Sequence, residues 1–247
     1  MLKRLLGDSV ALVFGNLETV FKVCGAWFVV QMIVFGAVAA LGLQGTAAFV
    51  FGLIPILIVS LAASASIAVA WHRFGLLSEY PGSIHLKLGP LEARFILKSL
   101  MLTLMMLACG LVLGIFHALT GSASVTGVLA IIFLIVGLPV FLRFSLILPA
   151  TAVDHDIGLG DAYQMSAGLG WRMFCAIFLL SLPFALIGEA LAYLLELSEG
   201  GLPVVLIQLK VLILNVLSQI ILMVLSISVL TSGFRIAMER EATIAQA

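Results

Sequence analysis

Four polar residues in the last apolar segment of the chain have the types and spacing that could do chemistry. They are Gln208, Asn215, Gln219 and Ser226. At 100° per residue, their intervals of 7, 4 and 7 residues place them within about 40° of one another on a helix. Amides and hydroxyls surrounded by hydrocarbon should face protein or water rather than lipid. We therefore expect a polar face that forms hydrogen bonds to neighbouring helices, or one that lines a water path or a slot for a lipid headgroup.

Two charged residues, Glu189 and Lys210, lie within the same apolar region. Along the expected helix 173–193, Glu189 lies about 25 Å from the first residue. Lys210 lies near the beginning of the expected helix 205–232. An ion pair between them would lower the cost of placing either charge in a low dielectric. We predict that pair. The alternative is that Lys210 extends alone to the membrane boundary.

Arrangements typical of catalysis or metal binding do not occur in the sequence. It contains no Ser nucleophile elbow, no His-Glu-x-x-His and no phosphate-binding loop. Its four histidines are scattered over different segments. We therefore expect a protein that is not an enzyme and that has no cofactor and no metal.

The composition excludes most classes of protein. Of the 247 residues, 63% are hydrophobic and 10% are charged, with 12 Lys and Arg balancing 12 Asp and Glu. An ordinary soluble domain has about 25% charged residues. So few charges cannot cover a soluble surface, which excludes a soluble enzyme, a nucleic-acid binder and a disordered chain. The composition indicates an integral membrane protein.

Long uncharged runs predict the number of membrane spans. Residues 23–72 and 99–142 contain no Lys, Arg, Asp or Glu, and one span needs about 20 apolar residues. Each run therefore contains two helices, with turns at 42–46 and 121–126. A polar cluster at 196–203 divides the third apolar region. The predicted spans are 23–42, 47–70, 99–119, 126–147, 173–193 and 205–232.

These spans define an all-α polytopic fold in one membrane domain, 1–247, built as three hairpins. A cytoplasmic amphipathic segment is expected before each hairpin. In the first of these, apolar residues recur at helical spacing between Leu6 and Phe21, with Asp8 and Glu18 on the opposite side.

The distribution of basic residues predicts the orientation. With six spans, 11 of the 12 Lys and Arg residues fall on the side of the termini, the exception being Lys210. Cytoplasmic loops collect Lys and Arg, so both termini are predicted to be cytoplasmic. The three tryptophans lie near the same helix ends, as in an interfacial belt. The expected cytoplasmic interface anchors are Trp71, Arg73, Arg143, Trp171, Arg172 and Arg235.

Two stretches of sequence resemble a known family. They are Ala70–Glu79 (AWHRFGLLSE) and Arg143–Asp154 (RFSLILPATAVD), the latter followed by Gly160–Tyr163 (GDAY). In this layout the chain resembles the six-helix membrane domain attached to some bacterial glycerophosphodiester phosphodiesterases, and related stand-alone uncharacterised inner-membrane proteins. No soluble stretch could hold the phosphodiesterase domain, so its activity is not implied. The resemblance implies a bacterial inner-membrane location and a lipid-related context.

The functional expectation is a non-enzymatic membrane protein that interacts with lipids or serves as an accessory or scaffold subunit. Its expected partners are membrane lipids, another membrane protein or a second copy, through rows of small residues such as Gly110-x-x-x-Gly114. Within the chain, the row of Ser60, Ser64 and Ala68 in the second span is the expected neighbour of the polar face of the sixth span. No nucleic acid is expected. The alternative is a small transporter or channel that uses the polar face of the sixth span.

Overall fold

The computed structural model describes residues 1–42, 45, 48–197 and 204–246. Regular elements in this part of the chain are all helical. Six helical stretches are long and apolar enough to cross a membrane: Leu17–Ala40, Val50–Leu77, Pro90–Thr120, Ala123–Ala152, Gly170–Leu191 and Ile213–Thr243. The prediction of six apolar helices is therefore confirmed. Most of the turn predicted at 42–46 and of the polar cluster predicted at 196–203 lies outside the described residues.

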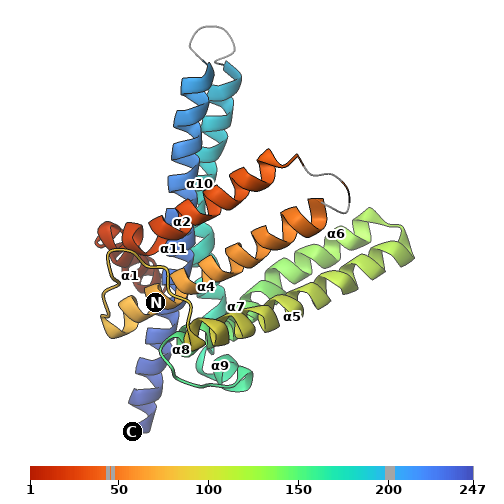
Figure 1. Cartoon of the computed structure of the whole chain (residues 1–247). Helices are drawn as coiled ribbons and strands as arrows, with labels where there is room; N and C mark the ends of the chain where they lie inside the picture. Colours follow the sequence, from red (N-terminus) through yellow and green to blue (C-terminus); the bar gives the residue numbers. More distant parts are fainter. Residues whose placement is uncertain (43–44, 46–47, 198–203, 247) are drawn as a thin grey trace.

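The first part of the chain forms one long helix pair. Helix α1 (Leu2–Phe14) is followed after Gly15 and Asn16 by α2 (Leu17–Ala40). The returning helix begins as a π-helical segment, η1 (Ala48–Leu53), and continues as α4 (Ile54–Leu77). Helices α2 and α4 pack against each other (Figure 1).

The second pair turns tightly. Helix α5 (Pro90–Thr120) ends at Gly121, whose φ of 60° suits a residue without a Cβ. The Ser122 hydroxyl then accepts a hydrogen bond from Val125 N–H at 3.3 Å and caps α6 (Ala123–Ile132). A π-helical segment, η2 (Phe133–Gly137), leads into α7 (Leu138–Phe144) and the short α8 (Ile147–Ala152).

The third pair is the longest. After the short α9 (Leu159–Met165), α10 (Gly170–Leu197) packs against α11 (Val204–Ala245). Helix α11 also contacts α1 and α4, so it connects elements from both ends of the chain.

Both π-helical segments precede a proline by the same interval. Segment η1 ends two residues before Pro55, and η2 ends two residues before Pro139. Proline has no N–H to donate to the carbonyl four residues earlier, and its ring crowds that carbonyl. A locally wider turn relieves the crowding, which gives these π-helical segments a physical cause in the sequence.

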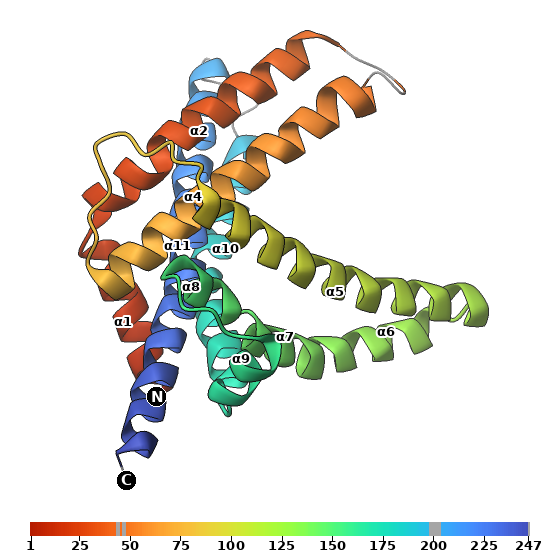
Figure 2. The same cartoon turned by 60° about the horizontal axis from the view of Figure 1, so that its bottom comes forward.

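The three helix pairs converge at one end and spread apart at the other (Figures 1 and 2). We call the converging end, where Arg73, Arg143 and Arg235 lie, the base, and the opposite ends the tips. Among the described residues, the apolar core lies toward the base. In α4 it extends from Ala63 to Phe74, and in α11 it begins at Ile220. Large apolar side chains of α5 and α6 nearer the tips, such as Leu107, Leu111 and Ile131, are exposed.

The close packing of the base can be tested with two glycine substitutions. A Cβ added to Gly170 at the start of α10 would clash with the main-chain carbonyl of Pro139, whereas Gly110 in α5 has open space around it. We expect Gly170→Ala to lower the free energy of unfolding by about 1–3 kcal/mol, as overpacking does. Gly110→Ala should be neutral or raise it by up to about 1 kcal/mol, because it favours the helix. Unfolding in mild detergent measures both, and equal effects would contradict this account of the base.

Candidate functional site in the helix bundle

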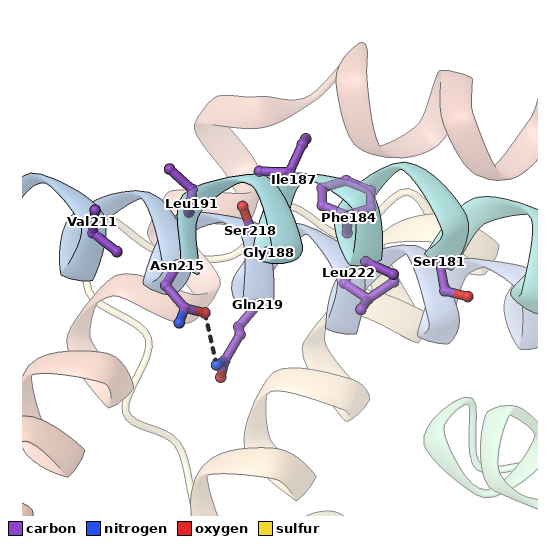
Figure 3. Close-up of a pocket in the computed structure, with 11 residues that line it drawn as sticks. Ser181, Phe184, Ile187, Gly188, Leu191, Val211, Asn215, Ser218, Gln219 and Leu222 are labelled. Atoms are coloured by element: carbon purple, nitrogen blue, oxygen red, sulfur yellow. Dashed lines mark hydrogen bonds between the residues drawn. The ribbon is translucent and has the colours of Figure 1, made fainter. Parts of the chain in front are cut away.

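The predicted polar face of α11 is present in part. Asn215 and Gln219 are both exposed, and Gln219 Nε2 donates a hydrogen bond to Asn215 Oδ1 at 3.1 Å (Figure 3). Ser226 donates to the carbonyl of Leu222 in its own helix at 2.9 Å. The side chain of Gln208 lies outside the described residues. The face therefore contains one amide pair and one hydroxyl bonded within its own helix.

The amide pair borders a cavity of about 320 Å³ between α10 and α11 (Figure 3). Its polar lining consists of Ser181, Asn215, Ser218 and Gln219. The other lining residues are mainly apolar and include Phe184 and Leu191 of α10 and Leu222 of α11. The site thus combines a few polar groups with hydrocarbon walls, which is the usual composition of a small-ligand pocket.

Gln219 also borders a second cavity, of about 260 Å³, between α2, α4 and α11. Its other polar lining residues are Gln31, Ser60 and Ser64. The small residues of the second span therefore do lie beside α11. Gln31 was missed because a single glutamine in an uncharged run has no periodic partner that would mark its face.

The hydrogen-bonding capacity of the amide pair is far from filled. Two side-chain amides offer four N–H donors and two carbonyl acceptors. Among the described residues, one N–H donor and one carbonyl acceptor are paired, and they pair with each other. An amide without a partner in hydrocarbon costs several kcal/mol. The donors and acceptors that the described residues leave open suit water, a lipid headgroup or another polypeptide.

Two buried hydrogen bonds join α4 to α11 on the base side of these cavities. Trp71 Nε1 donates to Ser228 Oγ at 2.7 Å, and His72 Nδ1 lies 2.9 Å from Thr231 Oγ1. Trp71 is 0% exposed. The expectation that Trp71 is an interface anchor is therefore wrong, because its indole is enclosed in the core between α4 and α11. Trp171, in contrast, is half exposed.

The three arginines at the ends of the even-numbered spans bond to main-chain carbonyls elsewhere at the base. Arg73 donates to Ala152 at 3.1 Å, Arg143 to Tyr163, and Arg235 to Gly75. All three side chains are half-buried. Their guanidinium groups therefore connect segments of the protein in addition to any contact with headgroups.

The remaining sequence-predicted residues lie apart from the amide pair. Arg172 is half-buried and contacts the Met1 sulfur at 3.0 Å. Glu189 and Lys210 are both exposed, and the ion pairs found in the described part of the chain do not include one between them. That pair stays a prediction. Among the described residues, no three His, Cys, Asp or Glu side chains form a group that could hold a metal ion.

Paired substitutions distinguish Ser226 from Ser228, which both lie on α11. Ser228→Ala leaves the buried indole N–H of Trp71 without an acceptor, so we expect it to lower the free energy of unfolding by about 1–3 kcal/mol. Ser226→Ala, which removes a bond within one helix, should change it by less than about 0.5 kcal/mol. Thermal unfolding in detergent compares them. A neutral Ser228→Ala would mean that the bond does not stabilise the base.

No family model matches the chain, and neither the curated proteins nor the solved structures contain a match. The resemblance to the membrane domain of glycerophosphodiester phosphodiesterases therefore stays a hypothesis that rests on residues 70–79 and 143–163.

Proposed function

We propose that this chain is a non-enzymatic integral membrane protein that binds membrane lipids between its helix pairs. In this proposal the pairs are three hairpins that cross a bacterial inner membrane, with both termini in the cytoplasm and an amphipathic segment before each hairpin. The protein would act as a lipid-binding accessory subunit rather than as a catalyst.

The observation that carries the proposal is the two cavities that share Gln219, one between α10 and α11 and the other between α2, α4 and α11. A hydrophobic driving force between helices is absent in lipid, so diverging helices can be stable there. The two cavities must nevertheless be filled. Lipid chains suit the apolar walls, and polar lipid atoms suit Asn215 and Gln219.

The charge distribution supports the same proposal. Basic residues concentrate at the base ends and in the segments next to them. Near an anionic membrane surface each Lys or Arg contributes about 1 kcal/mol of attraction. A base that is rich in cations therefore favours a leaflet with anionic lipid, which is the cytoplasmic one.

One observation favours transport as a second candidate. Gln219 borders both cavities, and Gln31, Ser60 and Ser64 line the cavity between α2, α4 and α11. A polar solute or water could use such a row of groups. A reconstituted vesicle that leaks only when the wild-type protein is present would favour transport over lipid binding.

A double substitution tests the lipid-binding proposal. We expect the wild-type protein, purified in mild detergent, to retain phospholipid that native mass spectrometry detects. Asn215→Leu combined with Gln219→Leu removes the polar groups at nearly constant volume and should reduce the retained lipid several-fold. Ser226→Ala is the control and should retain as much as the wild type. Wild-type protein that carries no lipid would overturn the proposal.

A further inference from the structure

A separate polar cavity of about 220 Å³ lies at the base, where the segment joining α4 to α5 runs back along α4 (Figure 2). Its polar lining residues are Arg73, Glu79, Tyr80, His85, Lys87 and Glu92. Two cations and two carboxylates therefore face one space, with no net formal charge. Such a lining does not favour a simple anion or a simple cation.

Two of the four charges already neutralise each other. Arg73 donates to both carboxylate oxygens of Glu79, from Nε at 2.7 Å and from Nη2 at 2.6 Å. These hydrogen bonds hold the pKa of Glu79 below its usual range, so its carboxylate stays ionised at neutral pH. The Arg73–Glu79 pair is thus a closed unit in the wall of the cavity.

The other two charges, Lys87 and Glu92, have no ion-pair partner among the described residues. Glu92 is only 2% exposed. One of its oxygens accepts a hydrogen bond from Gly89 N–H at 2.7 Å. A buried carboxylate is costly unless a positive group pairs with it. One Glu92 oxygen caps the N-terminus of α5, and the buried carboxylate suits a positive group in this cavity in addition.

A second polar atom in the cavity wall lacks a partner. The Nε2 atom of His85 is buried and makes no hydrogen bond. Burial lowers the pKa of His85, against the opposing effect of the Glu92 charge, so the ring is neutral near pH 7. Beside the carboxylate of Glu92, this nitrogen supplies a further site for an N–H donor.

An apolar groove of about 450 Å³ adjoins the polar cavity. It is lined by Ile58, Leu61, Ala62, Leu88, Gly89, Ala93 and Ile96. Gly89 belongs to the groove and bonds to Glu92, which belongs to the cavity, so the two spaces meet there. On α4, the groove residues Ile58 and Ala62 and the cavity residues Val69 and Arg73 recur at intervals of 4, 7 and 4 and share a face.

We propose that the cavity and the groove together bind one phospholipid with a phosphoethanolamine headgroup. Its ammonium donates to Glu92 and to Nε2 of His85, its phosphate contacts Lys87, and an acyl chain lies in the groove between α4 and α5. This proposal rests on the proposed lipid-binding function and names the lipid class at a site distinct from the amide pair.

The chemistry discriminates between headgroups. A primary ammonium has three N–H donors, whereas a choline has none and so cannot bond to Glu92 or His85. A phosphoglycerol headgroup has no cation, so it leaves the buried carboxylate unpaired. Bonds to a charged acceptor are strong enough for about tenfold discrimination.

The experiment uses the full-length protein in mild detergent with equal amounts of phosphatidylethanolamine, phosphatidylcholine and phosphatidylglycerol that carry identical acyl chains. Native mass spectrometry counts each retained lipid. We expect phosphatidylethanolamine to exceed phosphatidylcholine about tenfold. Glu92→Gln keeps an oxygen for Gly89 N–H but removes the charge. It should abolish this preference and increase the retention of phosphatidylglycerol.

Two further variants keep the test decisive if Glu92→Gln fails to fold. Lys87→Gln alters an exposed side chain and should reduce phosphatidylethanolamine binding several-fold. Ala93→Phe fills the groove and should do the same, whereas Ala118→Phe, exposed near the tip of α5, should not.

The outcomes separate the two proposals. Retained lipid without a headgroup preference overturns the phosphoethanolamine site alone, and so does retention of phosphatidylethanolamine that neither Lys87→Gln nor Ala93→Phe reduces. Complete absence of retained lipid overturns the lipid-binding function as well.

Discussion

Helix α4 is joined to α11 by the bonds of Trp71 to Ser228 and of His72 to Thr231, and the rest of the structure depends on this contact. In an apolar surrounding, burial of hydrocarbon does little to hold helices together, so buried polar bonds and close packing must do so. They are concentrated at the base, where the half-buried arginines also connect separate segments. Because these contacts are located there, the tips of the helix pairs are free to diverge (Figure 1). Gln219, on the tip side of these bonds, borders one cavity inside the α10–α11 pair and another between α2, α4 and α11.

The number and order of the spans could be predicted because each depends on local sequence. Twenty apolar residues suffice for one span, and Gly121 with Ser122 is enough to specify a turn. Contacts between side chains of different helices do not depend on local sequence. Trp71 occupies a helix end, where a tryptophan serves equally well in an interfacial belt or in a core. Only the position of Ser228, 157 residues later, decides between them. Hydropathy carries no information about such a partner.

The candidate sites show the same difference between what local sequence determines and what tertiary structure determines. Helical periodicity identified Asn215 and Gln219, because both lie on one helix and their spacing is visible in the sequence. It could not identify Gln31, a single amide on another helix. Nor could it identify the cavity around Glu92 and His85, which forms because the segment 78–89 runs back along α4. A buried carboxylate beside an unpartnered imidazole is a property of tertiary structure, and no motif in the segment distinguishes it from an ordinary polar loop.

The convergence of the helix pairs at the base also has a mechanical consequence. If the six apolar helices cross one bilayer, the molecule occupies less area in the leaflet at its base than in the leaflet at its tips. Such a wedge does work against the lateral pressure of the lipids whenever the angle between the pairs changes. The curvature and chain packing of the bilayer then influence the angle between the helix pairs. The π-helical turns before Pro55 and Pro139 are the places where the helices can bend in response.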